Sequence, residues 1–309
     1  MPRQAYGFIG IGAMGYYMAK NLRANLSAED TLTVFDLNKE AIWKFINEVA
    51  PARVEVARSA RELVEKSDNI FTALPEPQHV KSVFLEIFNT GPLSKPPTQD
   101  SRLLIDTSTI NANTSIEVAN LVHSNEAAHF LDSPMSGGQV GAMRGTLVFM
   151  VGGDKNMIPR AEASLLKMGR KFWHMGPQGM GSNGKIANNY ATALNTIAAA
   201  EIFNAAMKWG MNPEALTFLM NTATGKSWAT DCNHPIPGIL DTAPSSRDYD
   251  GGFALNLMQK DLRLAITAAK EAGAQMPLGD RAEEIYDATA AMAPRTKDFS
   301  IVFKYINSL

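Results

Sequence analysis

A short apolar segment that runs into three spaced glycines constrains the fold of this chain more than any other feature. Residues Ala5–Ile9 read as a β-strand, Gly10-Ile-Gly-Ala-Met-Gly15 follows at once, and residues 16–25 have a helical pattern. In such a strand-turn-helix unit the first glycine permits the tight turn, and the second lets backbone N–H groups approach an anion. The third lets the helix pack closely on the strand. The segment predicts the first unit of a Rossmann-type doubly wound α/β sheet that binds a dinucleotide.

The next strand pattern, residues 31–35, ends in an acidic residue. Asp36 follows Gly15 by 21 residues, which is about where a Rossmann unit places the carboxylate that binds the adenosine ribose. A carboxylate repels a 2′-phosphate, and the first basic residue after it is Lys39, so NAD is favoured over NADP. The alternative is an aspartate that only begins a turn. We expect the cofactor to contact Gly10, Ile11, Gly12, Ala13, Met14, Gly15 and Asp36.

Strand and helix patterns continue to alternate as far as residue 174. Helical patterns span 39–48, 60–66, 79–88 and 157–168, and strand patterns span 69–74, 103–106, 146–151 and 172–174. Ligands of open α/β sheets bind beyond the carboxyl ends of the strands, where Leu74-Pro75 and Thr107-Ser-Thr109 lie. The hydroxyls of 107–109 suit a helix cap as well as a ligand contact. The proline- and glycine-rich residues 91–100 predict a surface connection.

A second glycine-rich segment follows Pro134. Residues 137–145 contain four glycines and are preceded by Ser136. We predict a loop whose backbone N–H groups can surround a carboxylate or an oxyanion. A loop with a purely structural role is the alternative.

The character of the chain changes near Ile186. Alanine-rich helical patterns span 191–209, 213–221 and 255–273, and the proline- and glycine-rich residues 233–252 predict an extended loop. We therefore expect two domains. Residues 1–178 would form the dinucleotide-binding Rossmann-type domain, and residues 179–309 an all-helical substrate and dimerisation domain entered through a long interdomain helix. A helical half of this size often contributes to a dimer interface, so we expect a homodimer or a homotetramer.

The segment Gly181-Ser-Asn-Gly-Lys-Ile-Ala-Asn-Asn189 leads into the helical half. If it is helical, Lys185 and Asn189 lie four residues apart on one face, so an ammonium group and an amide point the same way. The pair suits catalysis on a small polar substrate. The alternative is a solvated surface lysine.

Composition excludes several classes of protein. The net charge is -2, from 29 basic and 31 acidic side chains, which offers no electrostatic basis for binding nucleic acid or an anionic membrane. Cys232 is the only cysteine and the five histidines are scattered, so we expect no disulfide and no metal site. No apolar run approaches the roughly 18 to 20 residues that span a bilayer. Because a strand pattern starts at Ala5, we expect no targeting segment in this sequence.

Several separated segments together resemble the β-hydroxyacid dehydrogenase family, and the resemblance covers nearly the whole chain. They are Gly7-Phe-Ile-Gly-Ile-Gly-Ala-Met-Gly15, Asp132-Ser-Pro-Met-Ser-Gly-Gly138 with Gly141-Ala and Gly145-Thr-Leu147, Gly184-Lys-Ile-Ala-Asn-Asn189, Tyr249-Asp-Gly-Gly-Phe253, and Leu257-Met-Gln-Lys-Asp-Leu-Arg-Leu-Ala265. Within the family, Pro235-Ile-Pro-Gly238 and Lys297-Asp-Phe-Ser300 resemble the subgroup that oxidises 3-hydroxyisobutyrate. Met135 and Gln259 depart from residues common in the family, Val and Ala.

The resemblance implies a role for individual residues. Lys185 matches the catalytic lysine, which would take the hydroxyl proton in oxidation and return it in reduction. The substrate-binding positions are Ser136, Gly137 and Gly138 for the carboxylate, Asn189 as the orienting amide, and Lys260 near both substrate and nicotinamide. Leu74, Pro75 and Thr109 match further cofactor contacts.

We therefore expect NAD-dependent oxidation of a short β-hydroxy carboxylate held between the two domains. The expected reaction converts 3-hydroxyisobutyrate to methylmalonate semialdehyde in valine breakdown. One alternative is a semialdehyde or glyoxylate reductase of the same family that uses NADPH, and another is a catalytically silent dinucleotide-binding sensor. The resemblance implies a mitochondrial location for a eukaryotic chain, and otherwise we expect a cytoplasmic one.

Overall fold

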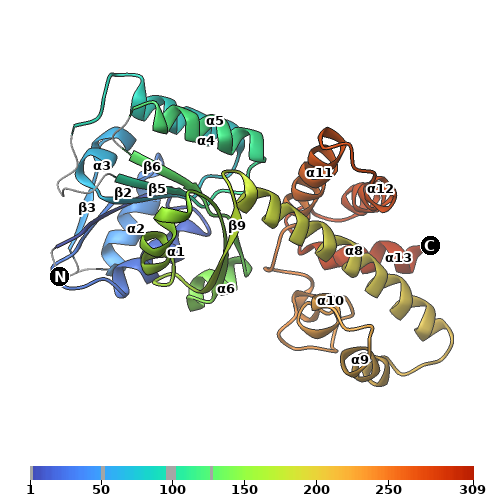
Figure 1. Cartoon of the computed structure of the whole chain (residues 1–309). Helices are drawn as coiled ribbons and strands as arrows, with labels where there is room; N and C mark the ends of the chain where they lie inside the picture. Colours follow the sequence, from blue (N-terminus) through green and yellow to red (C-terminus); the bar gives the residue numbers. More distant parts are fainter. Residues whose placement is uncertain (1–2, 50–52, 95–101, 126–127) are drawn as a thin grey trace. The chain divides into compact units, whose positions relative to one another are not determined.

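The computed structural model describes residues 3–49, 53–94, 102–125 and 128–309. They form two compact units, Met1–Lys185 and Ile186–Leu309. Figure 1 shows sheet and helices in the first unit and helices in the second.

Within the described residues, the first unit is built on a nine-stranded sheet. Six strands lie in the order β3-β2-β1-β4-β5-β6, and each neighbouring pair is parallel. They are β1 (Ala5–Ile9), β2 (Thr31–Phe35), β3 (Val54–Val56), β4 (Asn69–Thr72), β5 (Arg102–Asp106) and β6 (Ala128–Asp132). This order is that of the doubly wound dinucleotide-binding fold, so the predicted fold class is confirmed.

Three further strands extend the sheet beyond β6. β8 (Leu147–Gly153) is antiparallel to β6, β7 (Met135–Ser136) is antiparallel to β8, and β9 (Gly169–Gly176) is parallel to β8. β8 therefore lies beside β6, β7 and β9.

Helices cover both faces of the sheet because its buried strands carry apolar side chains on both sides. One face packs against α1 (Gly15–Ala24), α2 (Lys39–Val49), α6 (Gly138–Arg144) and α7 (Ile158–Leu165), which follows the short 3-10 segment η1 (Lys155–Met157). The other packs against α3 (Ala60–Lys66), α4 (Pro77–Phe88) and α5 (Ala112–His123). In Figure 1, α4 and α5 lie together on one side of the sheet. Phe8 and Ile9 show the alternation, because each is buried in a different one of these two cores.

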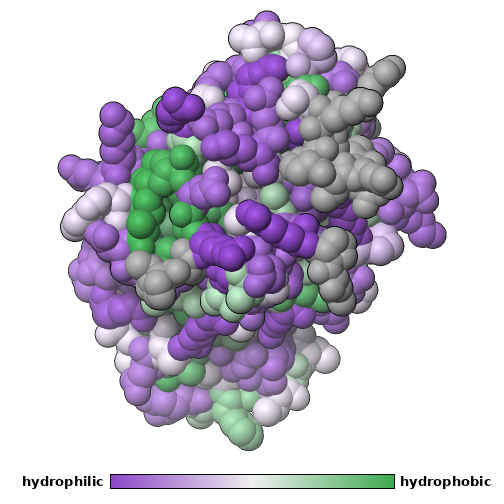
Figure 2. All heavy atoms as spheres, turned by 90° about the vertical axis from the view of Figure 1, so that its left-hand side faces the viewer, coloured by the Kyte–Doolittle hydropathy of each residue, from purple (hydrophilic) through white to green (hydrophobic). Residues whose placement is uncertain are grey.

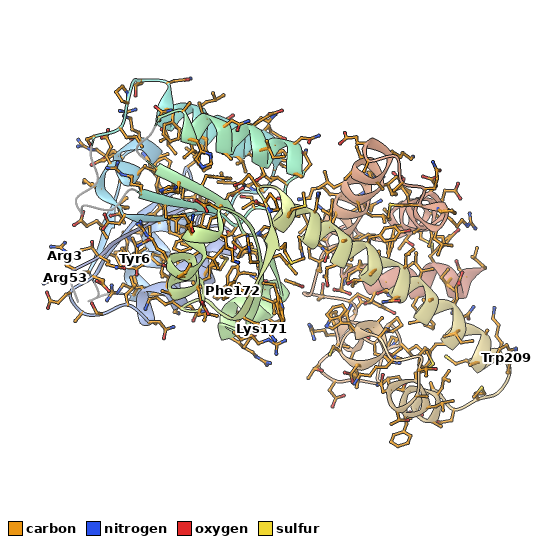
Figure 3. The ribbon with its side chains drawn as sticks, in the orientation of Figure 1. Arg3, Tyr6, Arg53, Lys171, Phe172 and Trp209 are labelled. Carbon is orange, nitrogen blue, oxygen red and sulfur yellow. The ribbon has the colours of Figure 1, made fainter. Side chains whose placement is uncertain are left out.

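The second unit is entirely helical among its elements of regular structure. It contains most of α8 (Met180–Lys208), then α9 (Pro213–Thr222), α10 (Trp228–Asp231), α11 (Leu255–Glu271), α12 (Pro277–Met292) and α13 (Val302–Ser308), with 3-10 segments η2 (Pro244–Arg247) and η3 (Phe299–Ile301). Phe203, Leu262, Tyr286 and Phe299 belong to its core. Trp209 lies just beyond the carboxyl end of α8 and is exposed (Figure 3).

Two parts of the chain differ from the sequence prediction. The loop predicted at 137–145 is a sharp turn followed by the helix α6, which positive φ angles at Gly137 and Gly145 delimit at its two ends. The long helix that enters the helical half begins at Met180, so the glycine-rich segment before Lys185 is part of this helix and not a turn ahead of it. β3, α5 and α12 were not predicted, and most of the predicted connection at 91–100 lies outside the described residues.

In the face that Figure 2 presents, hydrophilic residues predominate, with a large hydrophobic patch on the left and smaller hydrophobic areas elsewhere. Inside the first unit Tyr6 is buried, whereas Arg3 and Arg53 extend outward from its edge (Figure 3). None of the helices described in the structure is both long and apolar enough to span a membrane. Within the same described residues, no group of three or more histidine, cysteine or acidic side chains is arranged to hold a metal ion.

Candidate functional site

The three glycines after β1 have different surroundings. A side chain on Gly10, whose φ is +95°, would overlap the carbonyl oxygen of Ala73, and one on Gly15 would overlap the carbonyl oxygen of Gly10. Nothing lies within 4 Å of the position that a Cβ on Gly12 would take. The first and third glycines therefore permit close backbone packing, and the second leaves open space at the N-terminus of α1. These surroundings fit a bound pyrophosphate.

Asp36 connects the end of β2 to this glycine turn. Its Oδ2 accepts a hydrogen bond from the backbone N–H of Ile11 at 2.6 Å, and its Oδ1 accepts one from that of Asn38 at 2.7 Å. The hydrogen bond from Asn38 is the one expected of an aspartate that begins a turn, which is the alternative role of Asp36. Each carboxylate oxygen can accept a further hydrogen bond, so the half-buried group also suits contact with a ribose. Of the other residues in the turn, Ala13 is exposed and Met14 half-buried.

A buried carboxylate joins the loops that follow β4 and β5. Asp106 Oδ1 accepts hydrogen bonds from the hydroxyls of Thr72 at 2.7 Å and Ser108 at 2.6 Å. Ser108 Oγ in turn accepts one from the backbone N–H of Leu74 at 2.9 Å. The network links the start of the Leu74-Pro75 loop to the loop that carries Thr109. The role of Asp106 was not predicted, because its only signal in the sequence is an acidic residue at the end of an apolar strand.

Burial raises the pKa of Asp106 to about 6, because the charged form loses hydration. Hydrogen bonds from Ser108 and Thr72 oppose this shift, and Oδ2 has no hydrogen-bond partner among the described residues. A carboxyl group whose pKa is higher in the folded state than in the unfolded state binds more protons when folded. It therefore makes folding less favourable as the pH rises from about 4 to about 6.

Replacing Asp106 with asparagine should remove this pH dependence. Asparagine keeps an acceptor for Thr72 and Ser108 but carries no charge. We expect the free energy of unfolding of Asp106→Asn, relative to the unaltered chain, to rise by about 2 kcal/mol between pH 4 and pH 7. Urea unfolding at a series of pH values measures it, and titrating groups that do not interact with Asp106 cancel in the difference; the neighbouring carboxylate of Asp132 does interact with it. A difference that stays constant with pH would contradict the assignment.

Ser136 and the glycines after it form an accessible turn between β7 and α6. Ser136 is half-buried and pairs with Val148 of β8, and Gly137 is exposed. Gly137 has a φ of +131° and Gly138 one of +60°. A residue with a side chain rarely adopts these angles, which explains the glycine pair.

Asp132 holds the first turn of α8 against the sheet. Its Oδ1 accepts hydrogen bonds from the side-chain amide of Gln178 at 2.7 Å and the backbone N–H of Gly179 at 2.8 Å, and its Oδ2 accepts one from the backbone N–H of Ser182 at 2.7 Å. The side chain is buried. Burial raises the pKa of Asp132, and the backbone hydrogen bonds from Gly179 and Ser182 oppose the rise.

Lys185 follows Ser182 by one helical turn and lies at the end of the first unit. The residue is only 6% exposed, so the alternative of a solvated surface lysine is wrong. Burying an ammonium group is costly unless the charge is paired and hydrogen-bonded.

Asn189, one further turn along α8, belongs to the second unit and is also buried. Its Nδ2 donates a hydrogen bond to Asp261 Oδ2 on α11 at 2.6 Å. Asp261 Oδ1 lies 3.7 Å from Lys260 Nζ. The structure thus brings together Asn189, Lys260 and Asp261. Sequence analysis did not assign a role to Asp261, although the Lys260-Asp261 pair was a signal.

Two protein-family models match the chain. Residues 5–176 match the NAD binding domain of 6-phosphogluconate dehydrogenase. Residues 179–306 match a model described as NAD-binding of NADP-dependent 3-hydroxyisobutyrate dehydrogenase.

Known proteins are similar over almost the whole chain. A probable mitochondrial 3-hydroxyisobutyrate dehydrogenase of Dictyostelium discoideum is 37% identical, over 97% of this chain and 90% of the relative. An NAD-dependent L-serine dehydrogenase of Pseudomonas aeruginosa is 37% identical over 96% of each chain. Among solved structures, Mycobacterium tuberculosis 3-hydroxyisobutyrate dehydrogenase with L-serine has a TM-score of 0.88 and 36% identity, over 99% of both chains.

These matches agree with the strand order, the glycine turn and the helical second unit. NAD is the cofactor, as the sequence predicted. The chain belongs to the β-hydroxyacid dehydrogenase family and is an NAD-dependent oxidoreductase.

Proposed function

We propose that this enzyme oxidises 3-hydroxyisobutyrate to methylmalonate semialdehyde, a step of valine breakdown, with Lys185 as general acid and base. The observation that carries the proposal is the burial of Lys185 on α8, one turn before an asparagine that Asp261 holds in place. Relatives named 3-hydroxyisobutyrate dehydrogenase that match nearly the full chain support it.

The proposed cofactor contacts come from the carboxyl edge of the sheet. Gly12 leaves space for the pyrophosphate, Asp36 accepts from the adenosine ribose, and Leu74, Pro75 and Thr109 line the loops after β4 and β5. Lys260 would lie near both nicotinamide and substrate. Bound NAD supplies the hydride acceptor for alcohol oxidation.

Lys185 supplies the proton transfer. In its neutral form Nζ accepts the hydroxyl proton while the carbinol carbon gives up its hydride, so an aldehyde forms and the lysine becomes an ammonium group. In the reverse reaction the ammonium donates that proton to the aldehyde oxygen. Ser136, with the N–H groups of Gly137 and Gly138, would bind the carboxylate, and Asn189 would orient the hydroxyl.

L-Serine is a second candidate substrate. It shares the hydroxymethyl group and the carboxylate of 3-hydroxyisobutyrate and carries an ammonium group in place of the methyl group. The names of the Pseudomonas aeruginosa relative and of the Mycobacterium tuberculosis structure favour this candidate.

Initial rates with a small panel of substrates test the proposal. We expect the largest kcat/KM with 3-hydroxyisobutyrate and NAD, and a smaller value with L-serine. A larger value with L-serine would replace the proposed substrate. Faster reduction of a semialdehyde or of glyoxylate with NADPH would favour the reductase alternative. NAD binding without turnover of any member would favour the silent sensor.

Asp36 should set the preference between the two dinucleotides. We expect Asp36→Asn to lower the ratio of kcat/KM with NAD to that with NADP by about tenfold, because the repulsion of a 2′-phosphate is removed. Kinetics with both cofactors measure the ratio. The control is Asp30→Asn. Asp30 lies just before β2 and accepts a hydrogen bond from the backbone N–H of Gln4, so its replacement should leave the ratio unchanged. An unaltered ratio in Asp36→Asn would show that Asp36 serves only the turn.

We propose that the first unit is the dinucleotide-binding domain and that the helical unit serves substrate binding and dimerisation. A homodimer or homotetramer follows, which analytical ultracentrifugation would test. If the source is eukaryotic, relatives named as mitochondrial support a mitochondrial location.

A further inference from the structure

The first turn of α8 is capped by a residue distant in sequence. Other helices of the chain are capped by the residue immediately before them: Ser59 caps α3, Asn111 caps α5 and Asn212 caps α9. At α8, the N–H groups of Gly179 and Ser182 instead donate to Asp132, at the end of β6. A local cap only supplies a hydrogen-bond acceptor to the free N–H groups at the start of a helix. A cap that comes from the sheet also fixes where the helix lies on that sheet.

Two glycines let the same turn lie directly on the sheet backbone. A Cβ on Gly181 would overlap the carbonyl oxygen of Met150 in β8. A Cβ on Gly152 would lie 2.6 Å from the backbone nitrogen of Gly181 and 2.5 Å from Asp132 Oδ1. The helix start is therefore in close contact with the backbone of β8 and is hydrogen-bonded to the side chain of Asp132 at the end of β6.

Asp132 also stands close in sequence to the proposed substrate loop. Three residues lie between it and Ser136, and the carbonyl of one of them, Pro134, accepts a hydrogen bond from the backbone N–H of Met150 at 2.9 Å. On the other side, Ser182 precedes Lys185 by one turn. The carboxylate is thus a short, rigid link between the Ser136 turn and the lysine.

We propose that Asp132 is a positioning residue for the reaction, whose buried carboxylate fixes Lys185 relative to the Ser136–Gly138 turn. The inference rests on the proposed function of Lys185. Proton transfer requires the lysine nitrogen within hydrogen-bond reach of the substrate hydroxyl, so a displacement of about 1 Å costs up to about 100-fold in rate.

Kinetics of Asp132→Asn test the catalytic part of the inference. The side-chain amide of asparagine has one acceptor oxygen and one donor NH2 group, so it cannot accept hydrogen bonds from the N–H groups at both carboxylate positions. We expect kcat to fall about 10- to 100-fold, whereas the Kd for NAD changes less than about threefold. In a Lys185→Ala background the same replacement should lower the residual kcat less than about twofold, because a residue that acts through the lysine has nothing left to position. Equal losses in both backgrounds would overturn the proposal.

Hydrogen exchange of the full chain without substrate gives a readout independent of activity. We expect the amides of Gly179 and Ser182 to exchange at least about tenfold faster in Asp132→Asn, because their acceptor is weakened. Asp298→Asn is the matched control, since that buried carboxylate accepts from the N–H groups of Phe253 and Ser300 and from the Asn233 amide. Its effect should fall on Phe253 and Ser300 and spare Gly179 and Ser182.

Gln178→Met serves if Asp132→Asn does not fold. It removes one donor to Asp132 and keeps the charge and the backbone contacts, so we expect a loss in kcat of about threefold to tenfold that also vanishes without Lys185. If the unaltered enzyme is active and neither Asp132→Asn nor Gln178→Met lowers kcat, the inference about Asp132 is overturned. An unaltered enzyme that turns over no β-hydroxy acid would instead overturn the proposed function, and the exchange of Gly179 and Ser182 would still report how α8 is held.

Discussion

Replacing Lys185 with alanine should lower kcat by about two to four orders of magnitude, the usual contribution of a general acid or base. The Kd for NAD should stay within about threefold, because the glycine turn and Asp36 lie elsewhere in the first unit. The structural reason is the burial of the lysine on α8, which removes it from bulk solvent. Stopped-flow or steady-state rates give kcat, and quenching of protein fluorescence gives the Kd for NAD.

Two further replacements separate proton transfer from charge. Lys185→Arg keeps a positive group that does not lose its proton in proteins. It should be almost as slow as Lys185→Ala if the lysine transfers a proton, and close to the unaltered enzyme if the lysine only attracts the carboxylate. Lys208→Ala removes an exposed lysine from the last turn of the same helix and should leave kcat unchanged. Near-normal turnover in Lys185→Ala would refute the assignment of Lys185.

The regular parts of the fold were predictable because they follow from local patterns. A buried parallel strand reads as a short apolar run, and a covering helix as an apolar stripe. The prediction for β1 coincides with the strand that forms, and that for α3 with the helix. The predictions failed where glycine is ambiguous. Gly181 and Gly184 read as a turn that leads into a helix, but they lie within α8 itself. At Gly181 the sheet backbone leaves no room for a side chain, which explains a glycine at this helical position.

The acidic residues around the site were not predictable in their roles. Asp106, Asp132 and Asp261 each accept hydrogen bonds from residues far away in sequence, by 34 residues for Thr72, 50 for Ser182 and 72 for Asn189. Such pairs depend on which strands and helices become neighbours, and the spacing along one element does not contain that information. Lys185 could be singled out because its helix has a local signature and a family resemblance.

Replacing Gly15 with alanine should destabilise the fold, whereas the same change at Gly12 should spare the fold and weaken cofactor binding. At Gly15 the added methyl group would overlap the carbonyl oxygen of Gly10, and a backbone atom cannot move aside cheaply. We expect the free energy of unfolding to fall by about 3 kcal/mol in Gly15→Ala. Urea unfolding without NAD measures this change.

Gly12→Ala is the matched variant because it adds the same methyl group in the same turn. Its Cβ meets nothing within 4 Å, so the free energy of unfolding without NAD should change by less than about 1 kcal/mol. The methyl group would occupy the space that the pyrophosphate needs beside the N-terminus of α1, so the Kd for NAD should rise at least about tenfold. Calorimetric titration with NAD measures the Kd. A normal Kd in Gly12→Ala would mean that the dinucleotide does not cross this turn, because open space beside the backbone is the property that distinguishes Gly12 from its two neighbours in the motif.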